Sequence, residues 1–135
     1  MKRLITLTSL SLMLSIGSLQ AQVENRALLF TAEGSVDCGQ MPAIDKLSSY
    51  SLQFWLNPES WKDGASILSR GDGFSVKTAT PGNILFTVGN NSLTASSDEL
   101  VADDWNQITL ICDSGDALVL VNGVEAGSGT LDMIP

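Results

Sequence analysis

Short segments of alternating hydrophobic and polar residues run through the chain. The clearest is 50–56, Tyr-Ser-Leu-Gln-Phe-Trp-Leu, in which every second residue is apolar. A period of two is that of a β-strand with one buried face, and Asn57-Pro58 ends this one. Together with similar segments about ten residues apart, it gives nine predicted strands: 27–30, 36–41, 50–56, 66–69, 74–78, 84–88, 92–95, 108–112 and 117–121.

The turns between these segments favour hairpins. Gly89-Asn90-Asn91 and, above all, Asn122-Gly123 carry the residues that tight hairpin turns require. No segment shows sustained helical periodicity, and 44–49 has room for one helical turn at most. Many short strands with regular turn signals predict an all-β sandwich or barrel.

The alternation in 50–56 also predicts which residues face the core. Tyr50, Leu52, Phe54 and Leu56 share one face, while Ser51, Gln53 and Trp55 share the other. The second strongly alternating strand, 108–112, presents a matching apolar face. We therefore expect the first group to pack inward, against Ile108, Leu110 and Cys112.

The N-terminus has the features of an export signal. Lys2 and Arg3 precede an apolar run, 4–16, and Ala21 offers a small residue for cleavage. This run is shorter than the roughly 20 residues that cross a membrane, and no second hydrophobic span follows. Residues 1–21 are thus predicted to be a signal peptide and 22–135 one domain. The expected location is secreted, periplasmic or at the cell surface, without a membrane span.

The composition excludes several functions. The chain has no histidine, which rules out a Ser-His-Asp triad and a His-ligated zinc site. It has 7 basic and 15 acidic residues and a net charge of −8, and the predicted signal removes two of the basic residues. A domain this acidic is a poor partner for nucleic acid or anionic lipid. With 44% hydrophobic and 16% charged residues it is not a disordered tail.

Two cysteines, Cys38 and Cys112, lie in the predicted mature chain. Export allows a disulfide between them, and the alternative is two separate thiols. We expect them to be unpaired. Cys112 has the parity of Ile108 and Leu110 and should point into the core, whereas Cys38 should face away.

Five sequence blocks occur in an order that resembles a known family. They are Ala-Leu-Leu-Phe at 27–30, Tyr-Ser-Leu-Gln-Phe-Trp-Leu-Asn-Pro at 50–58, the 67–76 block, Asp-Trp-Asn-Gln-Ile with Cys-Asp at 104–113, and Val-Leu-Val-Asn-Gly at 119–123. Over about 27–126 the chain resembles the laminin-G-like, concanavalin A-like lectin/glucanase domains of exported bacterial proteins. It departs from their pattern at Cys38, Cys112 and Gln107, where the family usually has aromatics and histidine.

The resemblance implies a two-sheet antiparallel jelly-roll sandwich. The family continues past the Val-Asn-Gly hairpin with more strands than this sequence contains, so the expected sandwich is C-terminally incomplete. The strand at 27–30 would then lack its usual neighbour and present an open edge, which predicts instability or self-association.

The function implied is non-catalytic binding or adhesion outside the cytoplasm, to a glycan or a surface protein. Two alternatives stay open: a structural or assembly module, and an accessory domain of a carbohydrate-active enzyme. Enzyme activity is not expected, because the Glu-x-Asp-x-Glu strand of related glucanases is absent.

The candidate ligand-binding residues are Trp61, Trp55 and Gln53, since sugars stack on exposed aromatic rings. Trp61 stands in a polar loop and is the best exposed candidate, unless it folds over an edge of the sandwich. No cofactor is expected, because the loop carboxylates are interpreted as serving turns and solubility. The alternative is a calcium site, with Asp113 and Asp116 as first-choice ligands.

Overall fold

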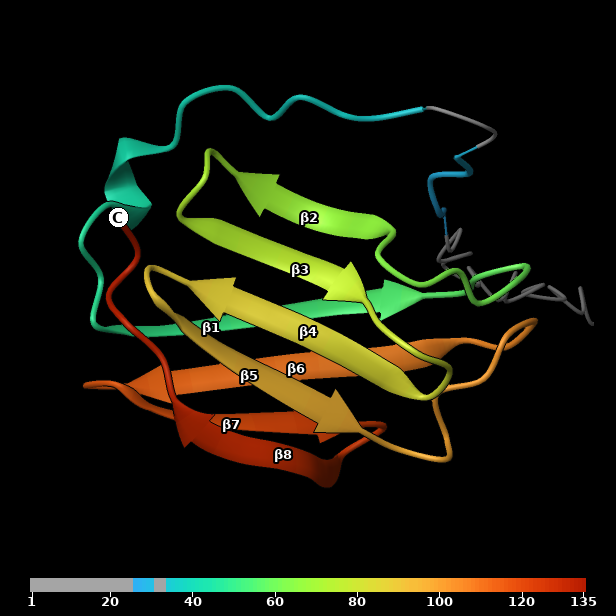
Figure 1. Ribbon diagram of the computed structural model, residues 1–135. Helices are drawn as coiled ribbons and strands as arrows, with labels where there is room; N and C mark the ends of the chain where they lie inside the picture. The colour runs from blue at the N-terminus through green and yellow to red at the C-terminus, as the bar shows by residue number, and fades with distance from the viewer. Residues whose placement is uncertain (1–25, 31–33) are drawn as a thin grey trace, which may run out of the picture. The chain divides into compact units, whose positions relative to one another are not determined.

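The computed structural model describes residues 26–30 and 34–135 (Figure 1). The chain divides into two units, residues 1–37 and 38–135. The predicted signal peptide, 1–21, lies outside the described residues. In the first unit the described residues have no regular secondary structure, and the second unit contains all the described strands.

The two strands expected at 27–30 and 36–41 are wrong. Leu28, Leu29 and Phe30 are 73%, 80% and 53% exposed, and none of them pairs with another strand. A short apolar run becomes a strand only where a neighbour supplies hydrogen bonds and cover. In 36–41 the backbone turns at Gly39, which has a φ of 70°, and Pro42 begins a single 3-10 turn, η1 (Pro42–Ile44). The open edge expected at 27–30 is therefore not a strand edge.

The second unit is a sandwich of two antiparallel four-stranded sheets, which confirms the predicted fold class (Figure 1). The β1 sheet has the order β1-β6-β7-β8, and the β2 sheet has the order β2-β3-β4-β5. The strand bounds are β1 (Ser49–Leu56), β2 (Ser66–Arg70), β3 (Phe74–Thr78), β4 (Asn83–Val88), β5 (Asn91–Ser96), β6 (Asn106–Asp113), β7 (Asp116–Val121) and β8 (Val124–Thr130). The Gly-rich β8 is the return strand of the Asn122-Gly123 hairpin.

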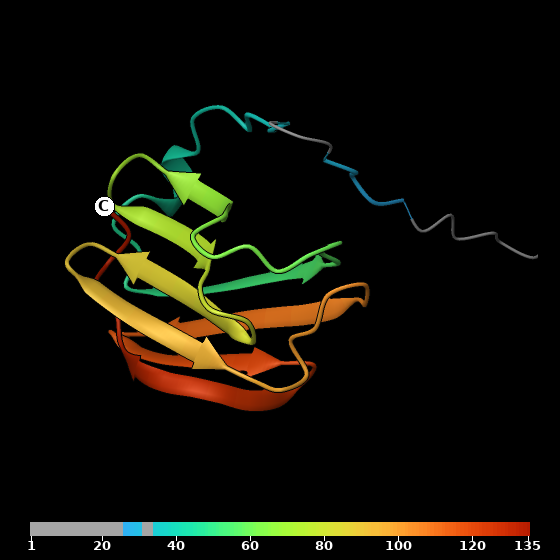
Figure 2. The ribbon, with the colours of Figure 1, turned by 45° about the vertical axis from the view of Figure 1, so that its right-hand side comes forward.

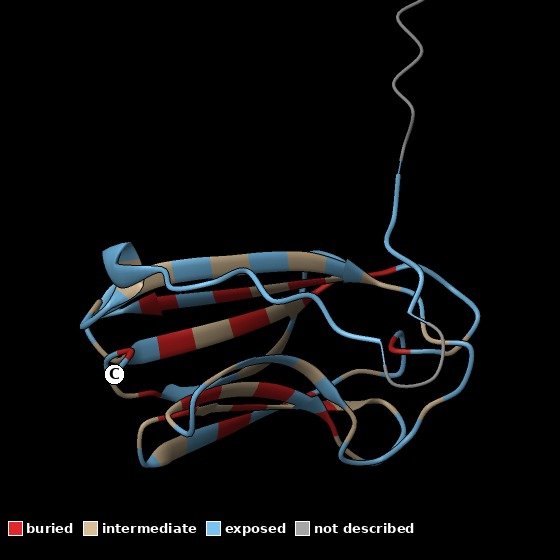
Figure 3. Ribbon diagram, turned by 90° about the horizontal axis from the view of Figure 1, so that it is seen from above, coloured by how far each residue is buried: buried red, intermediate tan, exposed pale blue. Residues whose placement is uncertain are grey.

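The core lies between the two sheets and draws buried residues from both of them, and Figure 3 shows buried positions in each layer. Strict alternation produces it: in β4 and β7 every second side chain is buried and the ones between are half-buried or exposed. The largest fully buried apolar side chains come from the central strands, and they are Phe86, Ile84, Ile108, Leu110, Val76, Val88, Val119 and Val121.

The register of β1 on β6 confirms the predicted inward face. Tyr50 lies opposite Cys112, Leu52 opposite Leu110, and Phe54 opposite Ile108. All of the β1 residues expected to face inward pack against the core but are only half-buried. The reason is position, because β1 is the outermost strand of its sheet.

The two sides of the sandwich differ. On one side β5 and β8 pack against each other. A side chain added at Gly127 of β8 would lie 2.8 Å from the Thr94 carbonyl oxygen of β5, so the lack of a side chain allows this close approach. On the other side lie β1 and β2, and no described strand pairs with the outer edge of either.

The segment after β8, residues 131–135, acts as a strap across one end of the sandwich. Leu131 and Ile134 are buried, and the Ile134 N–H donates to the Leu47 carbonyl while its own carbonyl accepts from Lys46. Asp132 accepts hydrogen bonds from the Asn90 backbone N–H at 2.8 Å and from the Asn91 side chain at 2.7 Å. Figure 2 shows this segment running up to the C-terminus beside the β2–β3 turn.

The cysteines are free thiols, as expected from the sequence. Cys112 is 2% exposed and belongs to the core, whereas Cys38 is exposed. The inward parity of β6 therefore places Cys112 correctly.

Candidate functional site

The solvent face of the β1 sheet carries two of the predicted ligand-binding residues side by side on β1. Trp55 lies directly opposite Gln107 of β6, and Gln53 lies opposite Thr109. Because directly opposed residues in an antiparallel pair point to the same face, one indole ring, two amides and a hydroxyl share this surface. We call these four residues the Trp55 platform.

Strand parity explains why the platform faces solvent. Leu52, Phe54 and Leu56 take the inward positions of β1, so Trp55 between the last two must point outward, where it is 58% exposed. An indole left this exposed offers a flat apolar surface, and the neighbouring amides offer donors and acceptors. None of the four platform residues is charged, so the surface suits a neutral ligand.

Trp61, the other candidate aromatic residue, has a different setting. It is half-buried and packs against the core. Its indole N–H donates to the backbone carbonyls of Ala79 at 3.0 Å and Thr80 at 3.1 Å. These contacts favour the alternative in which Trp61 folds over the sandwich, and its role in ligand binding stays a prediction.

The candidate calcium ligands Asp113 and Asp116 come together at the β6–β7 turn, where they lie directly opposite each other and are both exposed. Asp113 Oδ1 accepts hydrogen bonds from the hydroxyls of Ser49 at 2.8 Å and Ser114 at 3.3 Å. Across residues 26–30 and 34–135 no group of three or more acidic, Cys or His side chains is placed to hold a metal ion. The calcium site stays a prediction.

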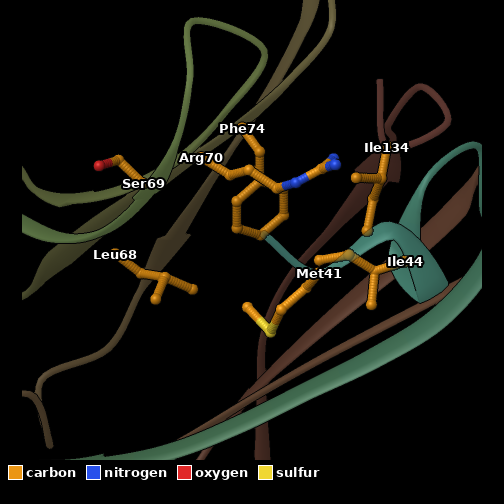
Figure 4. Close-up of a pocket in the computed structure, with 7 residues that line it drawn as sticks. All are labelled: Met41, Ile44, Leu68, Ser69, Arg70, Phe74 and Ile134. Atoms are coloured by element: carbon orange, nitrogen blue, oxygen red, sulfur yellow. The ribbon is translucent and has the colours of Figure 1, made fainter. Parts of the chain in front are cut away.

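The end of the sandwich beneath the strap contains a cavity of about 70 Å³ (Figure 4). An engineered cavity of about 150 Å³ holds one benzene ring, so this space is too small for a sugar ring. Arg70 at its rim forms an ion pair with Asp45 and donates to the Pro135 carbonyl. The lining is mainly apolar and belongs to the packing of the strap: Met41, Ile44, Leu68, Ser69, Arg70, Phe74 and Ile134.

One tyrosine is electrostatically unusual, and it lies away from the platform. Tyr50 is on the inward face of β1, and its hydroxyl is buried with no partner at hydrogen-bond distance and angle. Burial raises the pKa of Tyr50 well above its ordinary value of 10, and the adjacent Cys112 thiol adds to the increase. A phenol held neutral in this way is suited to packing rather than to proton transfer at neutral pH.

Sequence reasoning did not assign Gln107 and Thr109 to the site. Both have outward parity on β6, but only the register with β1 brings them beside Trp55 and Gln53. Asn106 was also not predicted from the sequence. Its side chain is 1% exposed, and its amide donates to the Val101 and Asp104 carbonyls, both at 2.9 Å. This amide fixes the loop that leads into β6.

Comparison with known proteins agrees with the fold. The family model described as the concanavalin A-like lectin/glucanases superfamily matches residues 30–133. No curated protein shows a significant match. A solved structure with some similarity is domain 4 of AbnA, a GH43 extracellular arabinanase from Geobacillus stearothermophilus, in complex with arabinotriose. It is 20% identical, with a TM-score of 0.43, and the match covers 64% of this chain and 47% of that chain.

None of the helical structure in the described part of the chain is long and apolar enough to cross a membrane.

Proposed function

The chain belongs to the concanavalin A-like lectin/glucanases superfamily, and from this premise we propose that it is a non-catalytic module that binds a neutral glycan outside the cytoplasm. The observation that carries the proposal is the Trp55 platform. An exposed indole on a regular sheet stacks on the CH face of a sugar, and side-chain amides bind its hydroxyls. The apolar N-terminus expected to direct export supports the location.

The rigidity of the platform supports binding at this surface. Trp55 and Gln53 belong to a strand that pairs with β6 without interruption over all eight residues. A ligand on this surface therefore meets side chains whose backbone is already ordered, which reduces the entropy lost on binding.

The placement of the candidate acidic residues Asp113 and Asp116 favours binding over hydrolysis. Asp113 and Asp116 lie at the β6–β7 turn. Asp113 is opposite Ser49, which is four positions along β1 from Gln53 and six from Trp55. The Asp113 carboxylate is already hydrogen-bonded to two hydroxyls. A glycosidase needs two carboxylates on either side of one bond, and the platform itself supplies amides, a hydroxyl and an indole.

An array of neutral oligosaccharides tests the proposal. We expect the wild-type chain to bind a subset of them, and Trp55→Ala to weaken that binding at least tenfold, which corresponds to about 1.4 kcal/mol. Gln53→Ala should weaken it by a smaller factor. Trp61→Phe tests the other candidate tryptophan, and unchanged binding by this variant would assign the stacking to Trp55.

Circular dichroism and a urea melt on each variant separate loss of binding from loss of fold. Because Trp55 is exposed, its replacement should leave stability nearly unchanged. No binding by the wild-type chain, or full binding by a folded Trp55→Ala variant, contradicts the proposal.

A second function, as an assembly module, is favoured by a different observation. The outer edge of β1 is unpaired among the described residues, and a sheet edge of this kind is a surface for other chains.

A further inference from the structure

The outer edge of β1 leaves a row of backbone groups without strand partners. β1 is at the end of its sheet, with β6 on one side and no described strand on the other (Figure 2). The strand is eight residues long and regular, because its register with β6 continues without a shift from Ser49 to Leu56. Long, regular edges present N–H and C=O groups at the spacing that another strand needs.

The other three edges carry features that discourage pairing. β2 has a register shift between Ser66 and Leu68. β5 and β8 pack against each other, and the pairing of β8 also shifts register, beside Val119 and Leu120 of β7. β1 has no such irregularity and contains no proline and no charged residue, Ser-Tyr-Ser-Leu-Gln-Phe-Trp-Leu. It is the edge with the least protection.

The inward face of β1 indicates what the missing neighbour must provide. Leu52 and Phe54 pack on the core yet are only half-buried, and no described strand pairs with the outer edge of β1. A strand added there must bring apolar residues on its inward face and polar ones on its outward face. The alternation of β1 itself meets this requirement.

We propose that β1 pairs antiparallel with β1 of a second copy of this chain. A two-fold axis perpendicular to the sheet, passing at Leu52 or Gln53, places each residue opposite one of the same face. The apolar side chains on the inward face of one β1 then continue those of the other copy. The serine, glutamine and tryptophan side chains on the outward face likewise form one continuous surface. The interface is isologous, and the two β1 sheets join into one eight-stranded sheet.

The charge distribution does not block a second copy at this edge. The chain has 15 acidic and 7 basic residues, so two copies repel each other over most of their surfaces. None of these acidic residues is in β1, so the strand itself adds no like charge to the contact between two copies. The pairing uses backbone groups and the inward row, so it leaves the outward-facing platform open.

Sedimentation velocity over a range of protein concentrations tests the pairing. The sample is the chain purified after expression with its own N-terminal segment. We expect the sedimenting mass to double as concentration rises. Gln53→Lys should abolish the doubling, because the two-fold axis brings the two lysines together at an edge position.

Thr109→Lys is the matched control. It adds the same charge on the same face, directly opposite Gln53 but one strand further from the interface, and it should still dimerise. Amide hydrogen exchange of the wild-type chain gives a second readout that needs no variant: protection in β1 should increase with concentration.

Three results overturn the proposal. A mass that stays monomeric while β1 amides are protected at every concentration indicates that another part of the same chain, such as the apolar segment 27–30, occupies the edge. Doubling that persists in Gln53→Lys places the interface elsewhere. Growth beyond a dimer contradicts closed two-fold pairing.

Discussion

Tyr50 shows how a single inward side chain links burial to pH. Its pKa is raised by burial first and by the Cys112 thiol second, while the unfolded chain has an ordinary phenol with a pKa of about 10. The folded protein therefore keeps the phenolic proton at a pH where the unfolded chain loses it. Stability is fully present below about pH 10 and falls as the pH rises above it.

Tyr50 is the only tyrosine in the chain, so absorbance of the phenolate reports this group alone. We expect a native titration midpoint above 10 that returns to about 10 in concentrated urea. Urea melts should show the free energy of unfolding decreasing above pH 10. In Tyr50→Phe the free energy of unfolding should decrease less above pH 10 than in the wild type. A Tyr50 phenol that titrates near pH 10 in the native protein would contradict this explanation.

The hairpin residue Gly123 offers a test of backbone strain without a change in packing. Its φ is 83°, and a side chain added there meets nothing within 4 Å. Gly123→Ala should therefore lower the free energy of unfolding by about 1–2 kcal/mol through the left-handed backbone alone. Gly123→Asn should lower the free energy of unfolding by less, because asparagine tolerates this conformation. Equal losses in the two variants would point to a different cause.

Which tryptophan is exposed could be predicted only in part. Parity alone places Trp55 on the outward face, and that prediction is confirmed by its exposure. The setting of Trp61 depends on where the carbonyls of Ala79 and Thr80 lie, in a turn eighteen residues away in sequence. A polar loop sequence carries no signal of that contact.

At the scale of elements, the alternation of apolar and polar residues correctly predicted most strands of the sandwich, but the strands expected before β1 are absent from the described residues. Strands with a strict period of two, such as β1, β4 and β6, were predicted nearly to their bounds. The segment 27–30 is a continuous apolar run without this alternation, and it forms no ladder, since strand formation depends on a neighbour that local sequence does not specify. β8 is the reverse case: Gly127 and Gly129 weaken its strand signal, yet β7 supplies a partner.

The strap after β8 should contribute measurably to stability through one carboxylate. Asp132 accepts hydrogen bonds from the Asn90 backbone and the Asn91 side chain, and bonds to a charged group are worth about 1.5–3 kcal/mol. We expect Asp132→Ala to lower the free energy of unfolding by that amount in urea melts. Met133→Ala, at the next position and 57% exposed, should change it by less than about 0.5 kcal/mol. Similar losses of stability in both variants would contradict a specific role for the Asp132 carboxylate.

For the whole molecule, net charge and the uncharged β1 edge act in opposite directions. The net charge of −8 keeps copies apart, and the proposed pairing occurs at a strand without charged residues. Raising the KCl concentration from about 20 to about 300 mM shortens the range of the repulsion, so the dimer should become stronger. Sedimentation equilibrium at the two salt concentrations measures the change, and a dimer that weakens with salt would show that ion pairs hold it together.

The strap is also expected to form late in folding. Its contacts join Lys46 and Leu47 to Ile134, residues separated by roughly ninety positions, and contacts so distant in sequence form slowly. Asp132 also joins the strap to Asn90 and Asn91 of the other sheet, so we expect the strap contacts to form after the transition state, once the two sheets have stacked. Loosening the strap, as in Asp132→Ala, should therefore raise the unfolding rate and leave the folding rate nearly unchanged. In stopped-flow measurements only the unfolding limb should move, so the strap sets the lifetime of the folded state rather than the speed of reaching it.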